Sequence, residues 1–263
     1  MTRKKLDVTI ENVSEVYEGA GGILWELLMG EQIHVGGAQE TDILAQKAGI
    51  SSESHILDVC SALGGPARQL AQQYHCHITG LDATSRMNQE AIARTEQAGI
   101  TTIEYRQGNA LDMPFQAATF DVVWGQDAWC YITDKQRLIS ECARVLKPGG
   151  MLAFTDWLET GPMSDEEWQE LNTFMVFPYI ETLQGYTSIT EEAGLSIMEA
   201  EDLSPDFANH IQSYLSMVQR NLRQSIIDTY GQALYNEVEQ GITLWRDASA
   251  AGKVGRGRII ARK

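Results

Sequence analysis

Apolar and polar positions in the middle of the chain alternate between two kinds of segment. Short apolar runs read as buried strands, namely HILDVC (55–60), CHITGLD (76–82), TIEYRQGN (102–109), FDVVWGQ (120–126) and MLAFTDW (151–157). Stretches with helical periodicity lie between them, among them GPARQLAQQY (65–74), SRMNQEAIARTEQAG (85–99) and DKQRLISECARVLKPGG (134–150). This alternation predicts an α/β fold with a doubly wound, mostly parallel sheet that binds ligands at the carboxyl ends of its strands.

Segments on either side of this core predict additional helical parts. Residues 1–50 are expected to form an amino-terminal helical lid, because YEGAGGILWELLMGEQIHVGG (17–37) contains too much glycine for one uninterrupted helix. Residues 51–263 form the main domain, with an aromatic-rich insertion at about 160–190 that we expect to cap the site. A strand at 195–203, a long helical stretch over 206–250 and a final strand RGRIIARK (256–263) follow.

Composition and charge exclude several classes of function. The 36 acidic residues outnumber the 20 basic ones, and the net charge of −16 should repel nucleic-acid phosphates. No apolar run reaches membrane-spanning length, so we expect a cytoplasmic protein without membrane insertion. The four cysteines form no CxxC pair, and the strand pattern places His75 and His77 on the face opposite Cys76. No metal site is therefore expected.

The loop after the first strand, CSALGG (60–65), has the outline of a nucleotide-binding turn. Gly64 and Gly65 permit a tight turn, and Cys60 and Ala62 are small enough for close backbone approach if neither requires a positive φ. No Lys-Ser/Thr pair follows the glycines, which excludes a P-loop. Asp82 ends the next strand, where a carboxylate can accept hydrogen bonds from both hydroxyls of a ribose. A dinucleotide enzyme would use the same acid.

Further motifs sharpen this interpretation. With GNALDMPF (108–115), FDVVWGQDAW (120–129) and ECARVLKPGGMLAFTDW (141–157), the loop resembles the class I S-adenosylmethionine-dependent methyltransferases over roughly residues 50–160. The segments at 17–37, GQDAWCYI (125–132) and ITEEAGL (189–195) resemble the branch that contains phosphoethanolamine, sarcosine/dimethylglycine and tocopherol or sterol methyltransferases. The resemblance implies a Rossmann-like sheet of seven strands, S-adenosyl-L-methionine as cofactor, S-adenosyl-L-homocysteine as product, and no metal.

The resemblance also implies a cofactor site. Asp82 would bind the ribose hydroxyls, Gln126 would lie near the methionine end, and Asn109 would replace the family's usual aspartate, its amide oxygen accepting from the adenine amino group. The complete set of expected cofactor contacts is Val35, Gly36, Asp58, Cys60, Ser61, Ala62, Gly64, Asp82, Ala83, Asn109, Ala110 and Gln126.

Methyl transfer requires an aligned neutral nucleophile and the exclusion of water. In the phosphoethanolamine branch a lid tyrosine pairs with a histidine four residues after an aspartate; these positions are Tyr17, Tyr131 and Asp127 here, so the histidine has become tyrosine. A phenol with a pKa near ~10 is a poor base at neutral pH. We therefore expect Asp127 or solvent to take the proton, and Tyr17 and Tyr131 to latch the lid and orient the amine.

The acceptor is expected to be a small amine. Trp157 and Gln184 stand where the phosphoethanolamine branch has phosphate-binding tyrosine and arginine, which argues against a phosphate dianion. Aromatic side chains that would surround a methylated ammonium are Trp25, Trp129, Tyr131, Trp157, Tyr179 and Tyr186. The specific hypothesis is methylation of sarcosine or dimethylglycine toward glycine betaine, with four candidate cations for the substrate carboxylate: Arg68, Arg137, Lys253 and Arg256.

Two alternatives remain open. A C- or O-methyltransferase for a prenylated quinol or another sterol-like apolar acceptor would share the cofactor motifs, and NTFMVFPYI (172–180) suits an apolar cap. A non-catalytic binding protein with the same fold would also explain Cys60 and Ala62 at family glycine positions.

Overall fold

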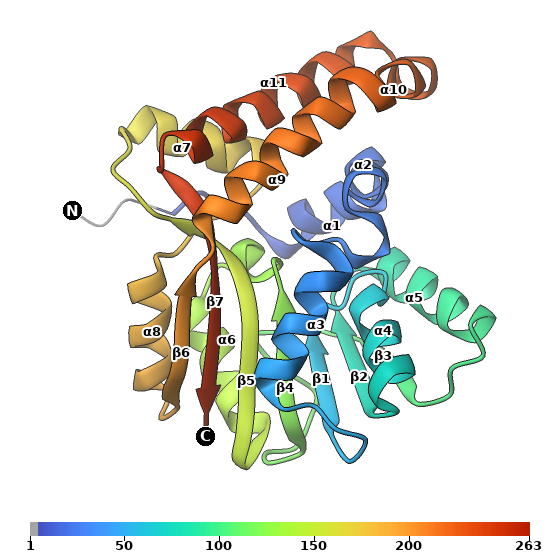
Figure 1. Cartoon of the computed structure of the whole chain (residues 1–263), viewed down its shortest axis with the longest axis vertical. Coiled ribbons are helices and arrows are strands. Elements are labelled where there is room, and N and C mark those ends of the chain that lie inside the picture. The colour runs from blue at the N-terminus through green and yellow to red at the C-terminus, as the bar shows by residue number, and fades with distance from the viewer. Residues whose placement is uncertain (1–4) are drawn as a thin grey trace.

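A seven-stranded sheet forms the centre of the computed structural model, which describes residues 5–263 (Figure 1). The strands are β1 (His55–Val59), β2 (His77–Asp82), β3 (Ile103–Gln107), β4 (Phe120–Gln126), β5 (Leu146–Glu159), β6 (Ser196–Asp202) and β7 (Val254–Arg262). Their order is β3-β2-β1-β4-β5-β7-β6, and only β7 runs antiparallel to its neighbours. The predicted doubly wound, mostly parallel seven-stranded sheet is confirmed.

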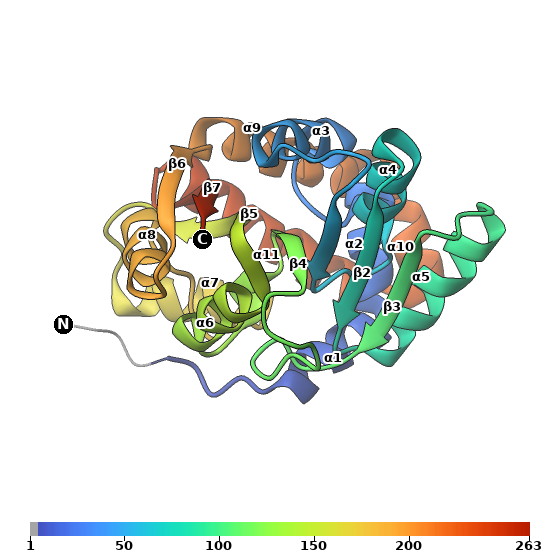
Figure 2. The same cartoon turned by 90° about the horizontal axis from the view of Figure 1, so that it is seen from below.

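Helices cover both faces of the sheet, as the nearly continuous apolar strands require. They are α1 (Ile10–Glu18), α2 (Ala20–Met29), α3 (Gly37–Ala48), α4 (Gly65–Tyr74), α5 (Ser85–Gln97), α6 (Lys135–Val145), α7 (Asp165–Met175), α8 (Leu183–Glu192), α9 (Ser204–Ser216), α10 (Arg223–Tyr230) and α11 (Gln232–Ala250). Figure 2 shows α3 and α4 on one side of the sheet and α6 on the other. A buried apolar cluster lies on each side, one around Leu44 and Leu70, the other around Leu138 and Phe154.

A third apolar cluster lies above the carboxyl ends of the strands, where α7, α9 and α11 pack together (Figure 1). The long helical stretch expected over 206–250 is interrupted twice. A π-helical turn, η3 (Met217–Leu222), follows α9, and Gly231 at φ +89° separates α10 from α11. The helix expected through residue 150 ends at Val145, because LKPGG already belongs to β5.

The amino-terminal segment divides between two roles. Helices α1 and α2 lie at the carboxyl ends of the strands, where a lid was expected. Helix α3, which the prediction included in the lid, instead buries Leu44, Ala45 and Ala48 against the sheet. The first four residues of the expected lid lie outside the described part of the chain. Across residues 5–263, no helix combines the length and apolarity needed to cross a bilayer.

Buried ion pairs join α3 to the carboxyl-terminal strand. Arg258 of β7 donates from Nε and Nη2 to Glu40 of α3 at 2.7–2.9 Å, and both side chains are at most 6% exposed. Arg256, two residues earlier on the same face of β7, donates from Nε to both carboxylate oxygens of Asp127 at 2.8 and 2.9 Å. These pairs tie the end of β4, α3 and β7 into one rigid unit.

We predict that Glu40→Gln lowers the free energy of unfolding by about 3 kcal/mol, because breaking a buried ion pair leaves a charge uncompensated. Lys47→Ala on the same helix removes the partly exposed pair with Glu199 and should cost less than about 1 kcal/mol. Urea denaturation of both variants measures the difference. Equal losses in the two variants would show that the buried Glu40 ion pair contributes no more to stability than the partly exposed Lys47 pair.

Candidate active site

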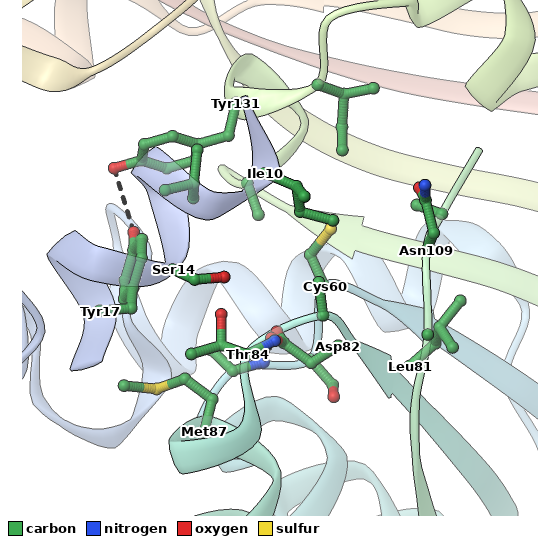
Figure 3. A pocket seen from close by; sticks show the side chains of 18 of the residues that line it. Ile10, Ser14, Tyr17, Cys60, Leu81, Asp82, Thr84, Met87, Asn109 and Tyr131 are labelled. Carbon is green, nitrogen blue, oxygen red and sulfur yellow. Dashed lines mark hydrogen bonds between the residues drawn. The ribbon is translucent and has the colours of Figure 1, made fainter. Parts of the chain in front are cut away.

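A cavity of about 420 Å³ opens at the carboxyl ends of β1, β2 and β4, and residues of α1 form its roof (Figure 3). Cavities of this size, apolar with a few polar groups, are typical of small-molecule sites in α/β folds. The wall contains most of the residues expected at a cofactor: Asp58, Cys60, Ser61, Ala62, Asp82, Ala83, Asn109, Ala110 and Gln126. Tyr17, Asp127 and Tyr131 line it as well.

The loop after β1 takes the shape of a glycine-rich turn without all of its glycines. Cys60 has φ +66° and Ala62 has φ +43°, which are unusual backbone angles for residues that carry a Cβ. The φ of +69° at Gly64 is ordinary for glycine. The condition set by the sequence, that neither residue adopt a positive φ, is therefore not met. Figure 3 shows the Cys60 sulfur pointing toward Ile10 of α1, so the thiol occupies part of the cavity.

Asp82 is held in position at the end of β2. Its Oδ1 accepts the N–H of Thr84 at 2.8 Å and its Oδ2 accepts the N–H of Ala62 at 2.9 Å. Burial raises the pKa of its carboxyl, and the two N–H donors oppose the rise. Each carboxylate oxygen keeps lone-pair capacity on the cavity side, where it can accept a hydroxyl of a diol.

Three buried polar atoms in the cavity wall have no hydrogen-bond partner among the described residues: Asp58 Oδ2, Ser61 Oγ and Gln126 Nε2. Gln126 Oε1 accepts from Thr41 Oγ1 and Trp124 Nε1, both at 3.1 Å, which leaves Nε2 as the free end of the amide. The Asp58 oxygen can accept a hydrogen bond, the Gln126 nitrogen can donate one, and the Ser61 hydroxyl can do either. Together they match the ammonium and the carboxylate of an amino acid. Buried atoms of this kind are costly unless a ligand pairs with them.

The lid is joined to the sheet through two tyrosines. The Tyr17 hydroxyl of α1 donates to the Tyr131 hydroxyl at 3.1 Å, and the two rings meet edge to face at 5.6 Å (Figure 3). Burial is the main reason that the pKa of each phenol lies well above its ordinary value. Neither phenol is therefore suited to act as a base at neutral pH. Arg86 of α5 holds the end of α1 by donating to the Tyr17 carbonyl at 2.7 Å.

Asp127 lies directly after β4 in a left-handed conformation, with φ +53°. Besides the Arg256 guanidinium, its carboxylate accepts the N–H of Val35 at 2.8 Å through Oδ2. Both oxygens of this carboxylate therefore already accept hydrogen bonds from neighbouring residues. The geometry favours a positioning role for Asp127 over general-base catalysis.

Two further cavities of about 10 Å³ each lie nearby: one shares wall residues with the large cavity, and the second shares wall residues with the first. The nearer is lined by Tyr17, Trp25, Met29, Ile33, Asp127, Tyr131, Trp157, Met175 and Phe177. The deeper is lined by Trp25, Trp157, Phe174, Met175, Ile211, Tyr214, Ile242 and Trp245. Because Tyr17, Ile33, Asp127 and Tyr131 also border the large cavity, they mark the place where the two compartments meet.

Several expected site residues lie elsewhere. Trp129 is fully buried under the sheet, where it stacks on Phe154 at 4.3 Å, and the Tyr186 hydroxyl donates to Asp156 in the same apolar cluster. The Tyr179 ring contacts the ammonium groups of Lys5 and Lys135, at 4.4 and 3.6 Å from its centroid, and lines none of these cavities.

The expected contacts Val35, Gly36 and Gly64 stand behind the cavity wall. Val35 acts through its N–H on Asp127, and Gly64 leaves room for the Tyr105 hydroxyl, which would lie 2.1 Å from an added Cβ. Of the predicted aromatic cage, Trp25, Tyr131 and Trp157 border the inner cavities.

The face of α1 that roofs the cavity was not predicted from the sequence. Ile10, Ser14 and Tyr17 follow the i, i+4, i+7 spacing of one helical face, and all three line the cavity. Thr9 and Asn12 form a capping box that fixes where α1 begins. These two signals in TIENVSEVY (9–17) were sufficient to locate the helix. Within residues 5–263, no group of three His, Cys, Asp or Glu side chains is arranged to hold a metal ion.

Comparison with known proteins supports the family resemblance. The profile of a family described as a methyltransferase domain matches residues 57–154. The chain is 31% identical to a glycine/sarcosine/dimethylglycine N-methyltransferase of Actinopolyspora halophila, over 93% of this chain and 46% of that protein. A sarcosine/dimethylglycine N-methyltransferase of Halorhodospira halochloris is 25% identical, over 98% of both chains. The chain spans about half the length of the first curated relatives that it matches.

Among solved structures, phosphoethanolamine N-methyltransferase 2 of Haemonchus contortus superposes with a TM-score of 0.88 at 22% identity, over 97% of this chain and 60% of that one. That structure contains phosphomonomethylethanolamine and S-adenosylhomocysteine. The likeness confirms the class I methyltransferase fold that the sequence motifs predicted.

We predict that Ala62→Gly raises the free energy of unfolding by about 1 kcal/mol, because glycine adopts positive φ without the steric cost that alanine carries. Ala93→Gly, on the exposed face of α5, should lower it by about 1 kcal/mol. Opposite signs in matched urea titrations are the expected result. A destabilised Ala62→Gly variant would mean that the loop is not strained at this residue.

Proposed function

Since this chain contains a methyltransferase domain with the class I fold, we propose that it transfers a methyl group from S-adenosylmethionine to the nitrogen of a small amine. The observation that carries the proposal is the junction of the two compartments. The cofactor-sized cavity and the nearer inner cavity share Tyr17, Asp127 and Tyr131, so groups bound on either side would meet there.

The residues of the large cavity fit the cofactor. Asp82 offers two oriented carboxylate oxygens to the ribose hydroxyls. The unpaired atoms of Asp58, Ser61 and Gln126 match the ammonium and carboxylate of the methionine part. Asn109 accepts the Leu111 N–H at 2.8 Å through Oδ1, and its amide stays at the exposed edge beside Ala110, where the adenine would lie. When bound, the cofactor supplies a methyl group on a positively charged sulfur, which an amine lone pair can attack.

The chain itself supplies alignment and shielding. Tyr17 and Tyr131 border the point of transfer and orient the acceptor nitrogen, while α1 closes over the cavity and excludes water. Trp25 and Trp157 present aromatic surface on the acceptor side, which attracts the positive charge that develops on nitrogen. An aliphatic amine is largely protonated at neutral pH, so its ammonium proton must pass to solvent before the nitrogen lone pair can attack the methyl group.

The finer proposal is that the acceptor is sarcosine or dimethylglycine and the final product glycine betaine. It is supported by the names of the relatives from Actinopolyspora and Halorhodospira. A cytoplasmic location remains a prediction of the sequence.

An apolar acceptor methylated on carbon or oxygen is the second candidate, and the deeper inner cavity favours it. Except for the Tyr214 hydroxyl and the Trp indole N–H groups, that cavity is lined by hydrocarbon and methionine side chains. Methyl transfer assays with methylamines and with quinols of similar size distinguish the two candidates.

We predict that calorimetric titration with S-adenosylhomocysteine gives binding that Asp82→Asn weakens by roughly 10- to 150-fold, the value of one hydrogen bond to a charged group. Asp112→Asn removes the same charge from an exposed neighbouring loop and should leave the affinity unchanged. Absence of binding to the unaltered protein at millimolar ligand would reject the enzyme and support the non-catalytic alternative, in which Cys60 and Ala62 close the loop.

We also predict a pH-dependent affinity for S-adenosylhomocysteine. Burial, and secondarily the neighbouring Asp82, raise the pKa of Asp58 to about 7 in the free protein. An ammonium favours the ionised carboxylate, so below pH 7 Asp58 must release a proton on binding, and affinity should fall by up to about tenfold per pH unit. Above pH 7 the affinity should not change with pH, because Asp58 is already ionised in the free protein. Asp58→Asn should abolish this slope, and a slope that persists in the variant would assign it to another group.

A further inference from the structure

Arg256 is a buried cation next to the acceptor compartment with one unused donor. Its side chain is 1% exposed, Nε is bound to Asp127, and Nη2 donates to Thr155 Oγ1 at 2.9 Å. Nη1 makes no hydrogen bond to the described residues, although Glu40 Oε2 lies 3.3 Å away as an ion-pair partner. An unsatisfied donor in a fully buried guanidinium is costly, which points to a ligand.

The other candidate cations for a substrate carboxylate are held elsewhere. Arg68 pairs with Glu31 and donates to the Leu63 carbonyl. Arg137 donates to the Leu111 carbonyl and pairs with Glu141 one turn along the same helix, α6.

Lys253 pairs with Glu167 at the start of α7. Buried Lys135 donates to the carbonyls of Ile132 and Tyr179. Arg256 is thus the cation of the described chain that combines a buried free donor with a place beside the inner cavities.

Three contacts place Arg256 at the acceptor side. Asp127, which it binds directly, lines both the large cavity and the nearer inner cavity. Trp157 is its direct partner across β5 and β7, so the two side chains project from the same face of the sheet. Tyr214 of α9 lines the deeper cavity beside Trp157; burial raises the pKa of its hydroxyl, Asp127 adds to the rise and Arg256 opposes it.

We propose that Arg256, with the Tyr214 hydroxyl, binds the carboxylate of an amino-acid acceptor whose nitrogen lies at the junction between Tyr17 and Tyr131. This assignment rests on the proposed methyltransferase function and specifies which residues select the acceptor. In such an acceptor the carboxylate carbon is two bonds from the nitrogen. Arg256 is suited to bind this carboxylate because it contacts Asp127, which borders the junction. Trp25 and Trp157 then surround the N-methyl groups.

Charge and volume define the class of acceptor. The pairs with Asp127 and Glu40 already balance the charges of Arg256 and Arg258. A bound carboxylate therefore adds one negative charge and a phosphate dianion would add two, which disfavours the dianion more strongly. The inner cavities of about 10 Å³ must expand to admit even a small molecule. Met29 and Met175 line them, and the flexible thioether side chain of methionine adapts readily.

The test compares two acceptors that differ in the group two bonds from nitrogen: dimethylglycine, with a carboxylate, and dimethylethanolamine, with a hydroxymethyl group. The unaltered full-length protein should show a higher kcat/KM for dimethylglycine. Tyr214→Phe should reduce kcat/KM for dimethylglycine at least about 10-fold more than for dimethylethanolamine, through KM, because a hydrogen bond to a charged group is lost. Arg256→Lys, which keeps the charge and loses Nη1, should change the ratio in the same direction.

One control variant and two measurements distinguish loss of acceptor binding from loss of the folded structure. Tyr235→Phe removes a hydroxyl from the same apolar cluster outside the cavities and should leave the acceptor ratio unchanged. Thermal unfolding and S-adenosylhomocysteine affinity show whether each variant is folded, and Tyr214→Phe keeps the test valid if Arg256→Lys does not fold.

Equal losses for both acceptors in Tyr214→Phe, or equal use of both by the unaltered protein, would overturn the Arg256 assignment alone. Transfer to neither amine, with quinols methylated instead, would overturn the proposed function as well.

Discussion

The ion pair between Asp127 and Arg256 is the contact on which the site depends. It joins the end of β4 to the antiparallel strand β7, and through the Val35 N–H it also fixes the segment that leads into α3. Asp127 is held at a positive φ, a conformation that costs free energy and that a surrounding set of bonds must stabilise. The junction between the cofactor cavity and the aromatic compartment is therefore built on a fixed charge pair.

The large cavity follows from the sheet itself. Parallel strands place Asp58, Asp82 and Gln126 at one edge of the sheet. The unpaired atoms of Asp58 and Gln126 match an ammonium and a carboxylate of a ligand, and the oriented Asp82 carboxylate matches a diol. The loop that carries Cys60 and Ala62 keeps the glycine-like backbone although both residues carry a Cβ. The hydrogen bond from the Ala62 N–H to the Asp82 carboxylate supplies part of the compensation.

Local patterns were enough to predict much of this arrangement. Strand-end acids, the loop after β1 and the pairing of Tyr17 with Tyr131 were inferred from motif and spacing, and the structure brings them to one cavity. The aromatic residues were less predictable, because Trp129 follows β4 and Trp157 lies near the end of β5 in the same sheet. One packs beneath the sheet on Phe154, while the other faces the helical layer above it.

The sequence by itself determined the sheet, its order of elements and the acids at its carboxyl edge, because hydrophobic periodicity and strand-end position are local properties of the chain. Tertiary structure decided which of the four candidate cations contacts a residue of the inner cavity wall and which aromatic side chains line a cavity. It also decided that α3 belongs to the core and that Cys60 and Ala62 take positive φ. Those outcomes depend on contacts between segments as far apart as Asp127 and Arg256, and no local pattern encodes them.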